Sequence, residues 1–207
     1  DPIACEGCGV CVRACPAKAI DFPEAECGEW YVSATRCGPM VHARLRAGAE
    51  NSGKLVTLVR QEATRLANER NAELVLIDGP PGIGCPVIAS LAGVDLVVIV
   101  SEPTVSGEHD LLRVAELIRH FRVPAALIMN KADINLEMSN RIQAKAQDLG
   151  IGLAGTVRYD EAVTQAQIQG KALVEYASNG AAEDVRAAWQ KIALLLRPLQ
   201  LEAQKAP

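Results

Sequence analysis

Four cysteines lie within the first sixteen residues in the spacing C-x2-C-x2-C-x3-C-P; they are Cys5, Cys8, Cys11 and Cys15. Bacterial ferredoxins bind iron–sulfur clusters with this spacing, because thiolates two residues apart can wrap one cluster in a tight loop. Glycines between the first three cysteines let the backbone approach the cluster sulfides. The run therefore predicts 4Fe-4S binding. Structural zinc, which usually uses two separated ligand pairs, and plain thiols are the alternatives.

In ferredoxins with two clusters, the fourth cysteine of each run binds the other cluster. By this rule the first three cysteines hold one cluster and Cys15 points to a second one. The sequence has no second run and starts with Asp1 inside half of such a module, so we expect a truncated chain. Cys27 and Cys37 are candidates for a missing ligand, although a small structural thiol is the favoured interpretation of both.

A second group of candidate residues follows the apolar run LVLI as DGPPG, which begins at Asp78 and ends at Gly82. An acidic residue at the tip of a parallel strand can hold the water shell of a nucleotide-bound Mg²⁺, as in a Walker-B strand. Gly82 would offer its backbone amide to a γ-phosphate with no side chain in the way. A simple turn at the end of a strand, with Asp78 as a helix N-cap, is the equally weighted alternative.

A third group, Asn-Lys-Ala-Asp from Asn130 to Asp133, follows the apolar run LIM. At a strand end an Asn side chain can contact a purine base, and a carboxylate would prefer the N–H groups of guanine. Asp133 has an alternative role, which is to turn the chain or cap the helix that begins near Asn135. Ligands of an open parallel sheet bind beyond the carboxyl ends of its strands, so the two loops together predict a nucleotide site.

The sequence offers no clear phosphate-binding loop. Its nearest match to G-x4-G-K-[ST] is GAENSGK at 48–54, where Leu55 replaces the Ser or Thr that would bind magnesium. We interpret this segment as a loop and the start of a helix, with Ser52 as a possible N-cap; a cryptic phosphate loop is the alternative. Without such a loop the chain is expected to bind nucleotide weakly or not at all.

Composition limits the classes of protein that fit. The chain has 207 residues, 49% of them hydrophobic, but only two Phe, three Tyr and two Trp, which suits an aliphatic core of helices on a parallel sheet. A formal net charge of −4 argues against a charge-dominated nucleic-acid surface. Seven cysteines, mostly clustered, favour a reducing cytoplasm. No apolar run reaches the roughly 18 residues that a membrane-spanning helix needs, so no stable membrane insertion is expected.

The elements that must position these residues can be read from the hydrophobic pattern. Residues 1–46 are predicted to form a ferredoxin-like α+β module and residues 47–207 a second domain. Strands alternate there with helices of ten to fifteen residues, which predicts an α/β fold with a mostly parallel sheet. The predicted elements are antiparallel strands at 28–36, helices at 53–71, 107–121, 139–150 and 184–196, and strands at 72–78, 95–103, 124–130 and 152–159, with a frayed tail after Arg197.

Six stretches of this sequence together resemble the MinD-like P-loop ATPases (ParA/Mrp superfamily) that carry an inserted ferredoxin domain. They are CEGCGVCVRACP, GEWYVSATRCGPMVHARL, ENSGKLV, LVLIDGPPGIGCPVIASL, VSEPTVSGEHDLLRV and NKADIN. The resemblance implies a SIMIBI P-loop NTPase-like fold that is incomplete here, because the Walker-A loop and a first cysteine run precede the inserted domain in that family.

The resemblance also implies roles for single residues. Asp78 is the Walker-B acid, Gly82 the switch amide and Asn130 a base contact, with ATP and Mg²⁺ as cofactors. It favours ATP over the GTP that Asp133 would suit. It further implies a homodimer or paralogous heterodimer. Cys85, just after the switch loop, could touch a cluster or a partner, but a buried small residue is the favoured interpretation.

The predicted function is an iron–sulfur ATPase that couples its nucleotide state to 4Fe-4S redox or to metal-cofactor assembly, with a redox or metal-cluster protein as partner. ATP hydrolysis by this exact chain is uncertain, because the Walker-A loop is absent. An electron-transfer ferredoxin module on a non-catalytic scaffold is the alternative. A third class, a positional protein that uses its C-terminal helix on membranes, is disfavoured because that helix has few basic residues. We expect a cytoplasmic protein.

Overall fold

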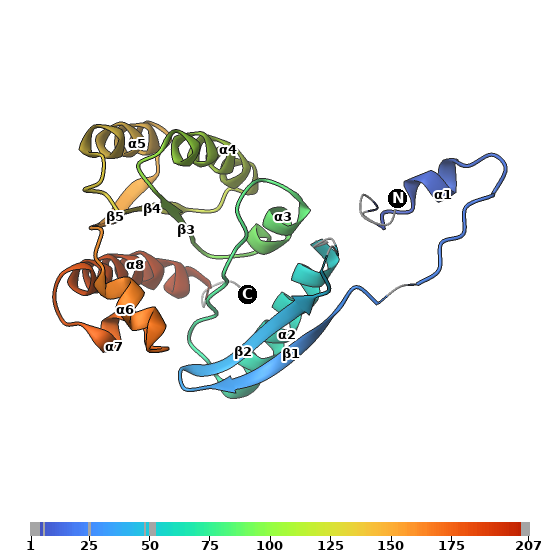
Figure 1. The fold of residues 1–207 in the computed structure, drawn as a ribbon, viewed down its shortest axis with the longest axis horizontal. Coiled ribbons are helices and arrows are strands. Elements are labelled where there is room, and N and C mark those ends of the chain that lie inside the picture. Colours follow the sequence, from blue (N-terminus) through green and yellow to red (C-terminus); the bar gives the residue numbers. More distant parts are fainter. Residues whose placement is uncertain (1–4, 6, 25, 48, 50–52, 204–207) are drawn as a thin grey trace. The chain divides into compact units, whose positions relative to one another are not determined.

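The computed structural model describes residues 5, 7–24, 26–47, 49 and 53–203, with side chains to residue 197. Ser52 and most of the candidate loop 48–54 lie outside the described residues. The chain divides into two compact units (Figure 1). The first comprises 1–80 and 84–90, and the second comprises 81–83 and 91–207. The expected domain boundary between residues 46 and 47 stays a prediction.

The first unit contains an antiparallel hairpin of β1 (Gly28–Thr35) and β2 (Gly38–Leu45). The register places Val32 opposite Val41. At the turn, the Thr35 hydroxyl donates to the Gly38 carbonyl at 2.6 Å, and Gly38 has a φ of 124°, which favours glycine. The antiparallel pairing predicted for 28–36 is therefore confirmed for β1, while its partner β2 lies in 38–45, where the sequence predicts no strand.

Three helices complete the described part of the first unit: α1 (Val10–Ala14), α2 (Gly53–Arg70) and α3 (Cys85–Leu91). Helix α2 was expected from its hydrophobic spacing, and it packs against β2. The Arg60 guanidinium of α2 donates to the Ala89 carbonyl of α3 at 2.5 Å, so the two helices are tied together. Partial burial lowers the pKa of Arg60.

The second unit is an α/β structure with a parallel three-stranded sheet in the order β3-β4-β5, as the sequence predicts. Its elements follow in alternation because each apolar strand is followed by an amphipathic helix. They are β3 (Val97–Ser101), α4 (Val105–Phe121), β4 (Ala125–Asn130), α5 (Leu136–Asp148), β5 (Gly152–Val157), α6 (Ala162–Ile168), α7 (Leu173–Tyr176) and α8 (Ala181–Ala203).

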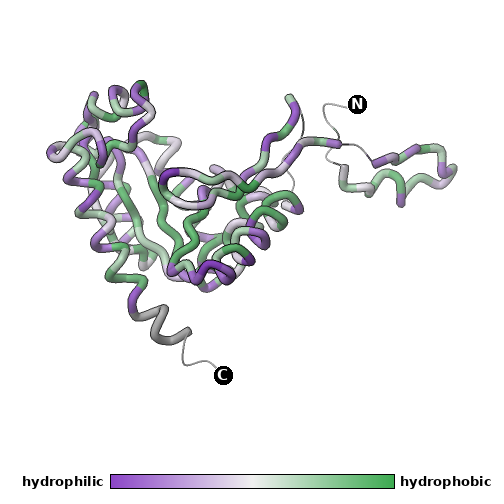
Figure 2. Tube along the Cα trace, turned by 90° about the horizontal axis from the view of Figure 1, so that it is seen from below, coloured by the Kyte–Doolittle hydropathy of each residue, from purple (hydrophilic) through white to green (hydrophobic). Residues whose placement is uncertain are grey.

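Helices cover both faces of this sheet (Figure 1). On one face Ala126 of β4 and Ala154 of β5 form a buried cluster with Ile192 of α8. Side chains alternate along a strand, so Leu127 and Met129, both fully buried, project to the other face, where α4 and α5 lie. Figure 2 shows the same pattern, with mostly hydrophobic strands and helices of mixed hydropathy.

An ion cluster joins α4 to α5. The carboxylate of Glu108, which is buried, pairs with the Lys145 ammonium at 2.7 Å and accepts from the Arg141 guanidinium at 2.6 Å. Lys145 and then Arg141 hold the pKa of Glu108 below its usual value. Because Glu108 is in the first turn of α4, its negative charge also suits the positive end of the helix dipole.

One predicted strand is absent. Residues 72–80 have no regular structure, and Leu76 is 81% exposed. A strand needs a neighbour to pair its backbone N–H and C=O groups, and within the described residues β3 pairs only with β4. Residues 72–80 are not paired with the open edge of β3, so this apolar run has no strand neighbour in the structure.

The C-terminal helix is longer than predicted. Helix α8 runs to Ala203 and so continues through Pro198, where the sequence predicts a frayed tail. Proline removes one backbone hydrogen bond of a helix but does not always end it. The sequence also gives no separate prediction for α1, α3, α6 or α7, all of which have seven residues or fewer.

Candidate functional site

The cysteine run forms a loop that leads into α1. Gly7 and Gly9 have φ values of 64° and 70°, a conformation that glycine adopts without strain. A Cβ on Gly9 would lie 3.3 Å from the ring of Phe22, so the aromatic ring covers this turn. Cys11 is carried by α1.

The thiols of the run differ in exposure. Cys5, Cys8 and Cys11 are exposed, and Cys15 is half-buried, where its sulfur accepts from the Ala19 backbone N–H at 3.5 Å. Among the described residues no three His, Cys, Asp or Glu side chains are grouped as a metal site. The donor chemistry nevertheless fits an iron–sulfur cluster, because exposed thiols on a glycine-containing loop can turn toward a common centre. The ligand set stays a prediction.

The remaining cysteines are not buried. Cys27 and Cys37, the candidates for a missing ligand, are both exposed, which is not the environment of a small structural thiol. Cys85 is also exposed, so the expectation that it is a buried small residue is wrong. It is the first residue of α3, and its carbonyl oxygen lies 3.1 Å from where a Cβ of Gly53 would be. Its neighbour in α2, Gly53, has no side chain to cover the thiol.

The DGPPG loop joins the two units. Asp78 is exposed and belongs to the first unit, and Gly82 belongs to the second. Gly82 has a φ of 91°, and a Cβ there would meet nothing within 4 Å. The constraint at Gly82 is therefore its backbone conformation and not the surrounding space. The roles of both residues in nucleotide binding stay predictions.

In the second unit, polar side chains gather at the carboxyl ends of β3 and β4. Glu102 follows β3, Asn130 ends β4, and Lys131 comes next with a φ of 51°. One carboxylate oxygen of Glu102 accepts from the Asn130 amide nitrogen at 3.3 Å and pairs with the Lys131 ammonium at 2.8 Å. Sequence reasoning missed Glu102. The signal available was its place directly after an apolar strand, in the same position as Asn130.

Asp133 binds the loop that follows β4 to the backbone just beyond the end of β5. Its carboxylate accepts from the Tyr159 backbone N–H at 2.7 Å. Asn135 caps α5 by accepting from the Met138 backbone N–H at 3.0 Å, so the capping role considered for Asp133 belongs to Asn135. Asp133 was interpreted as a residue that turns the chain or reads a base. In the structure the Asp133 carboxylate binds the Tyr159 backbone N–H. A contact between Asp133 and a base stays a prediction.

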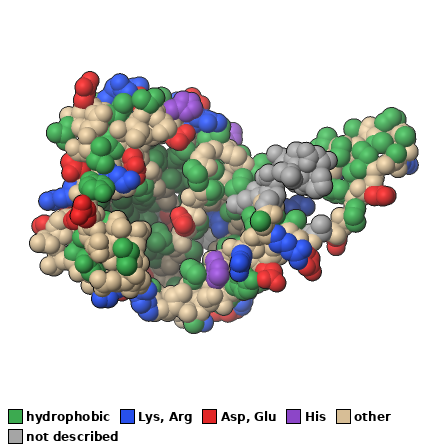
Figure 3. Space-filling model, in the orientation of Figure 1, with side chains coloured by type: hydrophobic (Ala, Val, Ile, Leu, Met, Phe, Trp, Pro, Cys, Tyr) green, Lys and Arg blue, Asp and Glu red, His purple; other side chains and the backbone are tan. Residues whose placement is uncertain are grey.

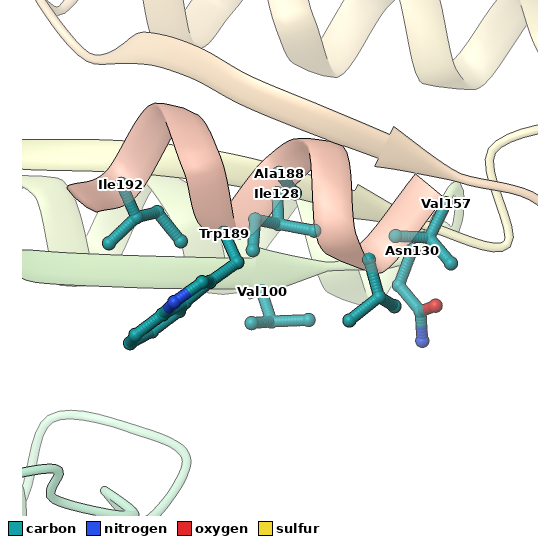
Figure 4. A pocket seen from close by; sticks show the side chains of 8 residues that line it. Val100, Ile128, Asn130, Val157, Ala188, Trp189 and Ile192 are labelled. Atoms are coloured by element: carbon teal, nitrogen blue, oxygen red, sulfur yellow. The ribbon is translucent and has the colours of Figure 1, made fainter. Parts of the chain in front are cut away.

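An apolar groove of about 270 Å³ lies beside Asn130, between the sheet and α8. Figure 4 shows Asn130 at one end of the groove and Trp189 and Ile192 toward the other. Asn130 and the indole N–H of Trp189 are the polar groups of the side chains in the lining. The other residues are Val100, Ile128, Val157, Val185, Ala188 and Ile192. The groove can therefore take a flat apolar ring with a polar contact.

Two carboxylates, those of Asp160 and Asp184, accept hydrogen bonds beyond the carboxyl end of β5. Asp160 accepts from the backbone N–H groups of Ala162 at 2.9 Å and Ala181 at 3.1 Å, and these two bonds lower its pKa. Asp184 accepts two bonds at 2.7 Å from the Arg158 guanidinium, which lowers the pKa of Asp184. In Figure 3 acidic and basic side chains are interspersed on the visible face of the second unit, with no single basic patch there.

Comparison with known proteins places both parts of the chain. Residues 1–21 match the 4Fe-4S binding domain family. Uncharacterized protein MJ0578 of Methanocaldococcus jannaschii is 37% identical over 135 residues, which are 65% of this chain and 47% of that protein. MJ0579 of the same organism is 25% identical over 173 residues, 83% of this chain and 57% of that protein. The chain thus spans about half the length of the curated relatives it matches.

Solved structures identify the fold. The MinD cell division protein of Aquifex aeolicus matches with a TM-score of 0.56 and 20% identity, over 69% of this chain and 61% of that chain. The same organism's MinC:MinD complex matches with a TM-score of 0.58 and 19% identity, over 78% and 66%. MinD of Pyrococcus horikoshii, solved with Mg-ADP, matches with a TM-score of 0.53 and 15% identity, over 70% and 57%.

The comparisons describe two parts of this protein, an N-terminal iron–sulfur domain and an α/β unit. The α/β unit has the MinD-like fold. With the N-terminal match, the chain combines an iron–sulfur domain with a MinD-like scaffold, as the sequence motifs predict. No helix within the described residues is long and apolar enough to cross a membrane.

Proposed function

We propose that this chain is part of an iron–sulfur ATPase in which the nucleotide state is coupled to 4Fe-4S redox or to metal-cofactor assembly. The observation that carries the proposal is the presence, in one chain, of a 4Fe-4S domain match and a MinD-like fold. Neither part alone would suggest coupling. Because the two sites belong to one chain, a conformational change caused by nucleotide binding can alter the cluster, and a change in the cluster can alter nucleotide affinity.

For the cluster, we propose Cys5, Cys8 and Cys11 as ligands of one 4Fe-4S group and Cys15 as a ligand of a second. Their spacing and the positive φ of Gly7 and Gly9 support this assignment. A bound cluster would supply one-electron chemistry. The protein's own contribution would be the thiolates and the backbone N–H groups of the loop, which can donate to sulfur.

For the nucleotide, we propose ATP with Mg²⁺. Asp78 would hold the water shell of the metal ion, and Gly82 would donate its backbone N–H to the γ-phosphate. Asn130 would contact the base, and Asp133 would hold the loop in place. The bond from Tyr159 to Asp133 supports ATP over GTP, because a carboxylate that holds the backbone is less available to guanine N–H groups.

The proposed partners are a second copy or a paralogue of this chain and a redox or metal-cluster protein, in the cytoplasm. The Aquifex aeolicus complex of MinD with MinC supports protein partners for this fold. The alternative function, an electron-transfer module on a non-catalytic scaffold, is favoured by the absence of regular structure in residues 72–80, which contain the proposed Walker-B acid.

The experiment is anaerobic reconstitution of this chain with iron and sulfide, followed by EPR of the reduced protein. We expect a 4Fe-4S signal that Cys8→Ser removes or strongly reduces, since each thiolate of the run is a cluster ligand. Thr64→Ser, a small change at an exposed position of α2 outside the cysteine-rich module, is the control and should keep the signal. Cys37→Ser should lower the signal only if Cys37 supplies the missing ligand. Stoichiometric zinc without iron in anaerobically purified protein would refute cluster binding. Redox cycling unaffected by ATP would favour the electron-transfer alternative.

A further inference from the structure

We propose that Glu102 is a positioning residue that orients the Asn130 amide and thereby selects a base with an exocyclic amino group. The inference rests on the proposed nucleotide site and adds a specificity-determining residue to it. It starts from one contact, the 3.3 Å hydrogen bond from the Asn130 amide nitrogen to a Glu102 carboxylate oxygen. The two residues are 28 positions apart in sequence and meet only because β3 and β4 are neighbours.

The orientation follows from hydrogen-bond chemistry. An ionised carboxylate can only accept, whereas an Asn amide has one side that donates and one that accepts. Asn130 must therefore turn its NH₂ group toward Glu102, and its carbonyl oxygen then points away. The Lys131 ammonium lies 2.8 Å from the same carboxylate oxygen, so Glu102 is held by an ion pair as well as by the Asn130 amide.

Asn130 lies at one end of a groove whose other lining residues are mostly apolar. A groove of about 270 Å³ is at the lower end of ligand sites, so it suits one ring system better than a whole nucleotide. An adenine that enters it can donate from its N6 amino group to the Asn130 oxygen. In the same ring position guanine presents its O6 acceptor, and two acceptors facing each other leave both without a partner.

The test is an NMR titration of this chain with ATP and, separately, GTP, each to millimolar concentration, because weak binding is then measurable. The Asn130 side-chain amide reports binding directly. We expect ATP to bind more tightly than GTP, and Glu102→Gln to weaken ATP about fivefold and to abolish the preference, since one neutral hydrogen bond is worth about 1 kcal/mol. A glutamine can donate as well as accept, so it no longer fixes the Asn130 amide.

Two controls separate orientation from charge. Glu116→Gln removes an exposed carboxylate on α4 and should leave the ATP-to-GTP ratio unchanged. Lys131→Met removes the ion pair but keeps the hydrogen bond between Glu102 and Asn130, so it should weaken both nucleotides if the ammonium attracts phosphate, and should keep their ratio. The ratio is the decisive measurement, because a purely structural role of Glu102 would change both affinities together.

The outcomes are distinct. A wild-type preference for ATP that Glu102→Gln abolishes supports the inference. A preference that survives in Glu102→Gln, or that Lys131→Met abolishes equally, overturns the inference and leaves the proposed nucleotide site intact. If the wild-type chain binds neither nucleotide at millimolar concentration, the residues of this chain do not form a nucleotide site by themselves, and the role of Glu102 in selecting a base is overturned.

Discussion

Strand β5 and helix α8 pack closely at Gly155, which makes this glycine an informative position to change. A Cβ added at Gly155 would lie 2.6 Å from the Cβ of Ala188 and 3.1 Å from its Cα. Neither atom can rotate away, since the first is fixed to the backbone and the second is part of it. Gly155→Ala must therefore push α8 away from the sheet, at the wall of the apolar groove that Ala188 lines.

The expected magnitude has two opposing parts. Overpacking a closely packed contact costs about 1–3 kcal/mol. Replacing glycine by alanine returns about 0.4–1 kcal/mol, because the unfolded chain loses conformational freedom. The net expectation is a loss of about 1–2 kcal/mol in the free energy of unfolding. With a denaturant dependence of about 2 kcal/mol per M, the urea midpoint falls by roughly 0.5–1 M.

The assay is urea unfolding of this chain, followed by far-ultraviolet circular dichroism. Gly152→Ala is the matched control, because Gly152 is in the same strand and a Cβ there would meet nothing within 4 Å. It should be neutral or slightly stabilising. The double variant Gly155→Ala with Ala188→Gly removes the Cβ of residue 188 and so makes room for the new Cβ of residue 155. It should recover part of the lost free energy of unfolding, although a glycine inside a helix itself costs about 1 kcal/mol. Equal midpoints for Gly155→Ala and Gly152→Ala would refute the reasoning.

Three further predictions concern the loops around the site. Asp133→Asn keeps an oxygen that can accept from the Tyr159 N–H, so adenine affinity in the NMR titration should stay within about twofold of wild type; a larger loss would show that the charge itself acts on the ligand. Thr104→Ala removes the hydroxyl that accepts from the Gly107 N–H at the start of α4, and should lower the free energy of unfolding by about 1 kcal/mol in the same urea assay. The pKa of Asp160 is lowered in the folded state by two backbone N–H donors, so its contribution to stability is complete above its ordinary pKa of about 3.9 and is lost as the pH falls through the lower, folded value. Asp160→Asn should therefore reduce the acid dependence of thermal unfolding between pH 2 and 5, and an unchanged dependence would contradict the assigned bonds.

Local patterns determined most of the elements. The helices around 53–70, 105–121 and 136–148 and the strands at 97–101, 125–130 and 152–157 were all predictable. Each has a hydrophobic period of its own, and α4 and α5 also have side-chain caps at Thr104 and Asn135. The cysteine run was equally readable, because its chemistry depends on spacing along the chain.

Pairing and packing decided the rest, because they depend on residues far apart in sequence. The apolar run before Asp78 has the composition of a buried strand, yet it is unpaired, since a strand exists only beside a neighbour. Glu102 became part of the candidate site only when the parallel register of β3 and β4 brought it to Asn130. Asp133 could be assigned a partner only once β5 placed the Tyr159 N–H within 2.7 Å. The sequence by itself determined which residues can do chemistry, whereas the tertiary structure alone decided which of them meet, because hydrogen bonds and close contacts act over a few ångströms in space.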